Sequence, residues 1–139
     1  LSEIRRRIDF LLALNKQRLL LSAHDISEGG LAVALAEMTV HHGATIQIET
    51  DHPLKTLFGE RLGRILLSAS KENASRVEAL AREAGIPLTL LGKSGGENLR
   101  IMVNGTRCLN VPLERYRPVF ERTIRKIMDA DPCDYVEGE

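Results

Sequence analysis

The residues with the clearest chemical potential lie in one segment, Leu21 to Met38, which reads LSAHDISEGGLAVALAEM. Asp25 and Glu28 place two carboxylates in the same turn, where they could hold a divalent cation beside a bound phosphate. Gly29 and Gly30 precede an apolar helix, and the first N–H groups of a helix attract anions because they have no intrahelical partners. The segment therefore predicts a turn that binds an anionic group, with a metal ion beside it.

The same turn also allows an interpretation without a ligand. Asp25 or Ser27 would then cap the helix, and Glu28 would favour its positive end. Two successive glycines at a helix start cost conformational entropy, unless another group must approach the backbone closely. From the residues alone, both interpretations stay open.

Other polar motifs are weaker candidates for a site. Glu60 and Arg61 precede an expected strand and are either solvated loop charges or contacts to a polar ligand. His41 and His42 end a helix, where positive charge is favoured. The glycine-containing loop at 94–96 lacks the Lys-Ser/Thr ending of a phosphate-binding P-loop. The acidic turn thus remains the leading candidate.

The periodicity of apolar residues places this turn between a strand and a helix of a mixed α/β domain. The expected helices are 2–16, 31–42, 54–58, 71–84 and 112–127, and the expected strands are 18–23, 44–49, 63–70, 87–91, 99–103 and 107–111. Asn104-Gly105 between the last two strands is the strongest short-range signal of a hairpin. We expect one sheet with helices packed on one or both faces.

Composition limits the classes of function. The 139 residues are 43% hydrophobic and 27% charged, which is the balance of one globular domain. Nineteen basic and nineteen acidic side chains cancel, so we expect no general attraction to nucleic acid or to a membrane surface. Cys108 and Cys133 belong to no metal-type pair and are expected to be free thiols of a cytosolic protein. The chain does not begin with Met, and we expect it to be a fragment of a larger protein.

Four motifs, in their order and spacing, resemble one family. They read SAHDISEGGLAVALAEM, LFGERLGRILLSAS, LTLLGKSGG and VPLERYRPVFERTI. Together they are similar to the C-terminal domain of the synthetase (PurL-type) component of phosphoribosylformylglycinamidine synthase, in the aminoimidazole ribonucleotide synthetase-like superfamily. The resemblance covers residues 1–130 and leaves 131–139 as an expected flexible tail. The HD-x-S-x-GGL form of the turn looks like the second of two duplicated copies in that family.

The resemblance implies a three-layer α/β domain with a mixed sheet and packed helices. It implies an ATP-dependent ligase of purine biosynthesis, which converts formylglycinamide ribonucleotide and glutamine-derived ammonia to formylglycinamidine ribonucleotide. ATP phosphorylates the amide oxygen, ammonia displaces the phosphate, and Mg²⁺ spreads the developing charge. The implied partners are the N-terminal domains of the parent enzyme and a glutaminase domain or subunit, and the implied location is the cytoplasm. The fragment alone is expected to be inactive and to bind neither ATP nor Mg²⁺ tightly.

The resemblance also implies roles for individual residues. Asp25 looks like a Mg²⁺ ligand of the family, and Glu60 looks like an acid that contacts substrate. Gly29 and Gly30 would supply backbone N–H groups, with neighbouring side chains orienting them. The implied ligand- or phosphate-binding residues are therefore His24, Ser27, Gly29, Gly30 and Glu60, and no catalytic residue is assigned.

Two alternatives stay open beside this ligase. One is a non-catalytic scaffold or interaction domain, in which the apolar helix at 31–38 serves packing and other faces dock partners. The other is a domain of a related ATP-dependent enzyme, such as selenophosphate synthetase, thiamine-monophosphate kinase or the hydrogenase maturation factor. The sequence upstream of Leu1 would discriminate between these enzymes.

Overall fold

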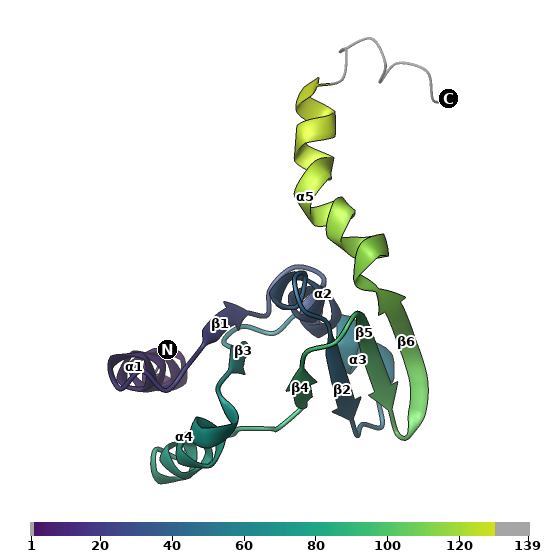
Figure 1. The fold of residues 1–139 in the computed structure, drawn as a ribbon. Coiled ribbons are helices and arrows are strands. Elements are labelled where there is room, and N and C mark those ends of the chain that lie inside the picture. Colours follow the sequence, from purple (N-terminus) through teal and green to yellow (C-terminus); the bar gives the residue numbers. More distant parts are fainter. Residues whose placement is uncertain (1, 130–139) are drawn as a thin grey trace.

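The computed structural model describes residues 2–129, with the backbone alone for 123–129. The helices are α1 (Ser2–Lys16), α2 (Gly30–Met38), α3 (Pro53–Phe58), α4 (Lys71–Glu83) and α5 (Leu113–Asp129), as Figure 1 shows. The strands are β1 (Ser22–Asp25), β2 (Ala44–Ile48), β3 (Ile65–Ser68), β4 (Gly92–Ser94), β5 (Asn98–Val103) and β6 (Thr106–Pro112). The mixed α/β class expected from the sequence is confirmed.

The strands form two sheets in place of one. β1 and β3 pair antiparallel, so that Asp25 lies opposite Ile65. The second sheet has the order β4-β2-β5-β6, in which β2 and β5 run parallel and the other pairs run antiparallel. Parallel strands need a long crossover, and the segment between β2 and β5 supplies it with α3, β3, α4 and β4.

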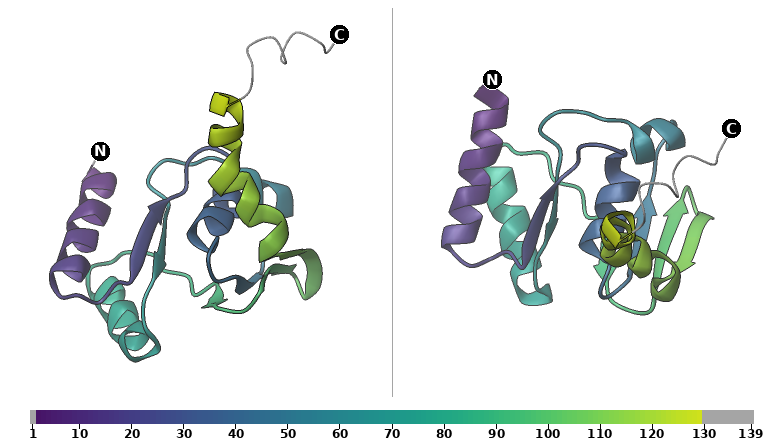
Figure 2. Two further views of the ribbon diagram at one scale, coloured as in Figure 1. Left: turned by 45° about the horizontal axis from the view of Figure 1, so that its top comes forward. Right: turned by 90° about the horizontal axis from the view of Figure 1, so that it is seen from above.

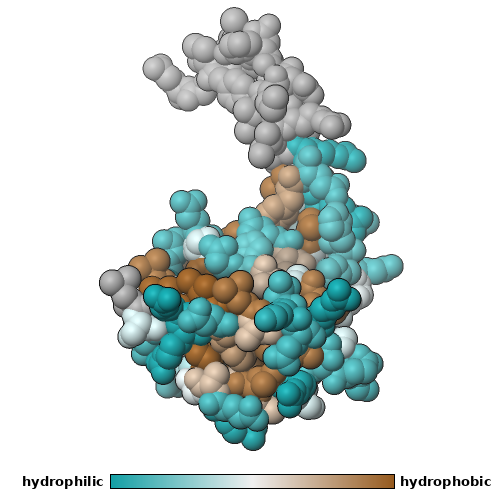
Figure 3. Space-filling view, turned by 90° about the vertical axis from the view of Figure 1, so that its left-hand side faces the viewer, coloured by the Kyte–Doolittle hydropathy of each residue, from teal (hydrophilic) through white to brown (hydrophobic). Residues whose placement is uncertain are grey.

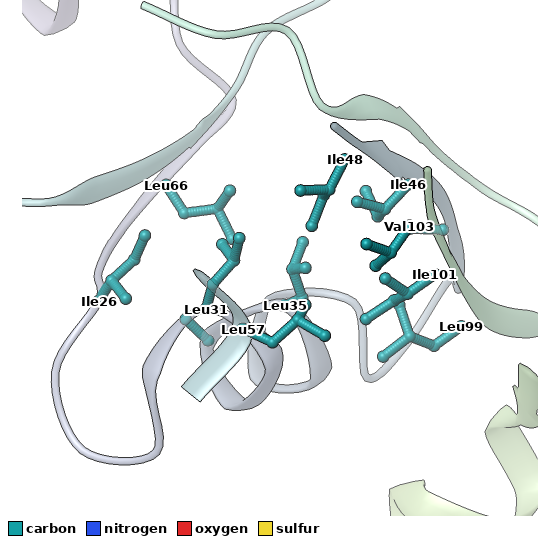
Figure 4. Packing of buried hydrophobic residues seen from close by; sticks show 12 residues of the cluster. Ile26, Leu31, Leu35, Ile46, Ile48, Leu57, Leu66, Leu99, Ile101 and Val103 are labelled. Atoms are coloured by element: carbon teal, nitrogen blue, oxygen red, sulfur yellow. The ribbon is translucent and has the colours of Figure 1, made fainter. Parts of the chain in front are cut away.

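Helix α2 lies between the two sheets, with α1 and α4 beyond the β1/β3 pair, as the right-hand view of Figure 2 shows. Its position follows from its sequence, because a helix that is apolar almost all round must be covered on several sides. Figure 4 shows Leu31 and Leu35 between residues of both sheets. The buried cluster around them consists of Ile26, Leu31, Ala34, Leu35, Ala44, Ile46, Ile48, Leu57, Leu66, Leu99, Ile101 and Val103.

A second, smaller cluster joins α1 and α4 across the other face of the β1/β3 pair. Its buried members are Phe10, Leu14, Val77 and Ala81, and Leu67 of β3 packs against them. Alternate side chains of a strand point to opposite faces, so Leu66 and Leu67 enter different clusters. The β1/β3 pair is thus covered by helices on both faces.

The start of α5 is tied to the end of α2. The Tyr116 hydroxyl donates to the Thr39 carbonyl at 2.9 Å, and Arg117 Nε donates to the Val40 carbonyl at 3.0 Å. A guanidinium at a helix C-terminus satisfies free carbonyls and complements the helix dipole. α2 ends at Met38, earlier than expected, and the Thr39 hydroxyl donates back to the Leu35 carbonyl at 2.7 Å.

Two expected strands differ from the structure. β1 begins at Ser22 and not at Arg18, because Arg18 has a left-handed φ of 55° in the turn that leaves α1. Residues 87–91, expected to form a strand, are not a strand in the structure. Their side chains are largely exposed, so a strand here would have no face to bury. The neighbouring segment Gly92–Ser94 pairs with β2 instead, where a Cβ on Gly92 would collide with the Thr45 carbonyl.

The expected tail at 131–139, and Cys133 within it, lie outside the described residues. Cys108 is an exposed free thiol on β6. No helix in the part of the chain that the structure describes is long and apolar enough to cross a bilayer.

Candidate functional site

The predicted turn connects the end of β1 to the start of α2. Its backbone is fixed at Ile26, a buried residue whose N–H donates to the Arg64 carbonyl at 3.0 Å. Gly29 and Gly30 follow with φ values of 76° and 69°, both in the left-handed region that favours glycine. The diglycine pair is therefore first a requirement of this backbone path.

Gly30 is a packing residue. It is buried against the end of α3, and a Cβ at this position would lie 2.7 Å from both the Leu57 carbonyl oxygen and the Phe58 carbonyl carbon. Its N–H donates to the Ser27 carbonyl at 3.1 Å. The close approach that two successive glycines predicted is real, and the approaching group is the protein's own backbone.

The Gly29 amide contacts the second predicted motif. Its N–H donates to Glu60 Oε1 at 3.3 Å, across 31 residues of sequence. A carboxylate at a helix start is favoured by the helix dipole and by the free N–H groups there. The structure thus brings Gly29 and Glu60 together, and the Glu60 carboxylate already accepts from the Gly29 N–H.

The expectation that both glycine amides stand open is wrong, because each donates to a group of this domain. The alternative in which Asp25 or Ser27 caps the helix also differs from the structure. The cap position falls on Gly29, which has no side chain to offer, and Ser27 contributes only its carbonyl. The turn is thus neither a preformed open anion cradle nor a side-chain-capped helix start.

His24 does not join the diglycine turn. Its Nε2 lies 3.2 Å from Glu37 Oε2, and its Nδ1 donates to the Asp25 carbonyl at 2.6 Å. Glu37 follows Gly30 by seven residues, which corresponds to about 10 Å along the helix axis. His24 therefore ties β1 to the far half of α2.

Asp25 is the metal ligand that the resemblance implies, and its carboxylate is directed to solvent. The side chain is 76% exposed and lies 4.0 Å from His24 Nδ1. Within the described residues, no group of three or more His, Cys, Asp and Glu side chains could hold a metal ion. Mg²⁺ in nucleotide sites keeps several waters and takes one or two carboxylates together with substrate phosphates. A single exposed Asp fits such a shared site as one ligand.

Sequence reasoning missed two features beside the turn. Arg7 of α1 donates from Nη1 to the Gly63 carbonyl at 2.8 Å, which fixes the loop that contains Glu60. No local signal marks this contact, because the partners lie 56 residues apart. The second feature is a set of exposed apolar side chains on α3 and this loop: Leu54, Phe58 and Leu62, the last of them 91% exposed.

The fold and this turn define a mixed α/β domain in which a glycine-started, buried helix follows an exposed acidic turn. The chain belongs to the family described as "AIR synthase related protein, C-terminal domain", whose model matches residues 2–104.

Curated relatives share this region at moderate identity. The chain is similar to phosphoribosylformylglycinamidine synthase subunit PurL of Moorella thermoacetica, 38% identical over 110 residues, which cover 77% of this chain and 15% of the relative. The same subunit of Thermus thermophilus is 35% identical over 111 residues, covering 78% and 15%. That of Anaeromyxobacter dehalogenans is 43% identical over 128 residues, covering 81% and 16%. The chain thus spans about 15% of the length of these relatives.

Solved structures agree in fold. The chain superposes on a chain of the structure described as "Structure of PurLQS from Thermotoga maritima" with a TM-score of 0.74 at 20% identity, covering 82% of this chain and 21% of that one. The structure described as T. maritima PurL complexed with ATP gives a TM-score of 0.71 at 21% identity, covering 78% and 20%. At this identity the likeness shows the fold alone.

Proposed function

We propose that this chain is the C-terminal domain of a PurL-type synthetase. The parent enzyme would convert formylglycinamide ribonucleotide, ATP and glutamine-derived ammonia to formylglycinamidine ribonucleotide, ADP and phosphate. The observation that carries the proposal is the identity of 35–43% with curated PurL subunits over about four fifths of the chain. ATP, Mg²⁺, a glutaminase partner and a cytoplasmic location are parts of the same proposal.

Within that enzyme, the domain would supply one wall of a nucleotide or phosphate site. Asp25 would offer a solvent-facing carboxylate to Mg²⁺, which neutralises phosphate charge when it is bound. Glu60 and Gly29 would form the edge of the same wall, because they already contact each other beside the turn. Ser27 would hold the backbone of the turn through its carbonyl, His24 would tie β1 to α2, and neither would touch the ligand. No residue of this chain is assigned a role in bond making or breaking.

The other wall would come from the parent chain, for which α1 and β1 offer a docking face. This α1–β1 face consists of Ile8, Leu11, Leu12, Leu20 and Leu21, which line a shallow hollow. Leu12 and Leu21 are 61% and 73% exposed, and Figure 3 shows apolar surface in a band on this side of the molecule. A monomer gains nothing from such a patch, whereas another domain of a chain several times longer would bury it.

The proposal is tested in the parent enzyme. Asp25→Ala combined with Gly29→Val is expected to abolish ADP formation from formylglycinamide ribonucleotide, ATP and ammonium chloride, or to prevent assembly. Asp9→Asn, on an exposed position of α1, is the matched control and should retain turnover. Wild-type turnover and unchanged stability in the double variant would remove Asp25 and Gly29 from the site.

Titration of the isolated chain with ATP, ADP and MgCl₂ tests whether the nucleotide site is formed jointly by this domain and other domains of the parent enzyme. Little or no heat of binding is expected, because one exposed carboxylate and one occupied amide cannot hold a nucleotide alone. Tight binding by this chain would contradict a site divided between domains.

A further inference from the structure

We infer that Arg7 is a positioning residue, which holds the loop at 59–63 so that Glu60 meets the Gly29 amide. The meaning of this contact for ligand binding rests on the proposed function, whereas the positioning itself does not. Arg7 lies on α1 and belongs to neither the acidic turn nor the Glu60 motif.

The loop at 59–63 is fixed at its first residue by α3 and β3. The Gly59 N–H donates to the Lys55 carbonyl at 3.0 Å, which continues the last turn of α3. The Gly59 carbonyl accepts from Arg64 Nη1 at 3.4 Å, so a guanidinium from the start of β3 reaches back across the loop. A Cβ at Gly59 would collide with the Lys55 carbonyl, which leaves the backbone little room to shift here.

Arg7 fixes the other end of the loop. Its Nη1 donates to the Gly63 carbonyl at 2.8 Å in a partly buried contact. Gly63 has a φ of 78°, and a Cβ there would lie 3.0 Å from the same Nη1, so the guanidinium packs closely on this residue. The hydrogen bond has a charged donor, which makes it stronger than one between neutral groups.

The loop tip between these two ends has no packing of its own to hold it. Glu60, Arg61 and Leu62 are exposed, and the contact of Glu60 with Gly29 is long and solvent-accessible. The direction of the Glu60 side chain is therefore set by the two ends of the loop. Arg64, the residue before β3, is held through its carbonyl, which accepts the Ile26 N–H. The side-chain hydrogen bond to Gly63 comes from Arg7.

The experiment follows the Gly29 amide resonance in ¹⁵N-labelled protein of the 139-residue chain. Glu60→Ala removes the acceptor and defines the resonance position of the free amide. Arg7→Met is expected to move the Gly29 resonance most of the way to that position, and Arg7→Lys should restore it in part because Lys keeps one donor. Arg5→Met, at an exposed position of the same helix, is the matched control and should leave Gly29 in place. A Gly29 resonance that moves in Glu60→Ala and stays unchanged in Arg7→Met overturns the inference.

The parent enzyme supplies a second readout. Arg7→Met and Glu60→Ala should each lower KM for ATP by about 3–10-fold, the size expected for one hydrogen bond, because both free the Gly29 N–H for phosphate, with kcat little changed. The double variant should show no further fall, because both changes remove the same contact. Additive effects would overturn the coupling of Arg7 to Glu60. Unchanged KM in all three variants, together with the expected movement of the Gly29 resonance, would count against the proposed function alone.

Discussion

Gly30 is constrained both by its left-handed backbone conformation and by close packing, and alanine substitutions at Gly30 and Gly85 separate the two effects. Gly30 has a φ of 69°, which strains any residue with a Cβ, and it also packs against the backbone at the end of α3. Gly85 has nearly the same φ, 65°, yet no atom lies within 4 Å of the Cβ that alanine would add. Gly85→Ala is therefore a matched control: it introduces the same strain of a left-handed φ, but its new Cβ contacts no neighbouring atom.

The expected magnitudes follow from these two contributions. A left-handed conformation costs an ordinary residue about 1–2 kcal/mol, and this is the whole effect expected for Gly85→Ala. Gly30→Ala adds overpacking against Leu57 and Phe58, for which about 1–3 kcal/mol is typical. The approaching atoms are backbone and cannot rotate away as a flexible side chain would, so the upper half of that range is expected. Gly30→Ala should thus lower the free energy of unfolding by about 3–5 kcal/mol.

Urea unfolding followed by circular dichroism measures both variants. With a denaturant slope of about 1–3 kcal/mol per molar, the midpoint of Gly30→Ala should lie about 1 M below that of Gly85→Ala. Equal midpoints would mean that the close packing of α2 on α3 does not constrain this position. The diglycine would then reflect its backbone conformation only.

Two further predictions concern pH and the α1–β1 face. The pKa of Glu72 is lowered by a hydrogen bond from its own backbone N–H and then by the Ser70 hydroxyl, so its contribution to stability is present above the unfolded pKa. That contribution is lost as the pH falls through the folded-state pKa of Glu72, and Glu72→Gln should flatten this acidic part of the pH profile of unfolding. Leu12→Ser with Leu21→Ser should leave the melting temperature of this chain nearly unchanged, because both side chains are exposed, and should lower that of the parent enzyme. An equal change in both proteins would argue against a docking role of this face.

Features set by neighbouring residues could be predicted from the sequence. The helix at 71–83 begins at the Ser70 cap, whose hydroxyl accepts the Asn73 N–H, and the hairpin turns at Asn104, which has a φ of 48°. Capping and turn chemistry act within a few residues, and for that reason their signals are readable locally. β4 was not predictable in this way, because Gly92–Ser94 becomes a strand only through its pairing with β2.

The candidate site was predictable in its residues and not in its contacts. Gly29 and Glu60 were both named from the sequence, yet only the folded chain joins them through a hydrogen bond. The sequence predicts His24 beside the glycines because it is near them along the chain, whereas the strand directs it to Glu37. Arg7 carried no signal at all, since an arginine on the polar face of a helix is ordinary.

The position of β3 between the two hydrophobic clusters affects how the domain unfolds. A ribbon of two strands is marginal in water by itself, and this one persists because Leu66 is covered from one side and Leu67 from the other. Neither half can melt without exposing a leucine that the remaining half cannot cover. The domain should accordingly unfold in a single cooperative transition. A destabilising substitution beside Phe10 should therefore reduce the hydrogen-exchange protection of the Leu35 amide.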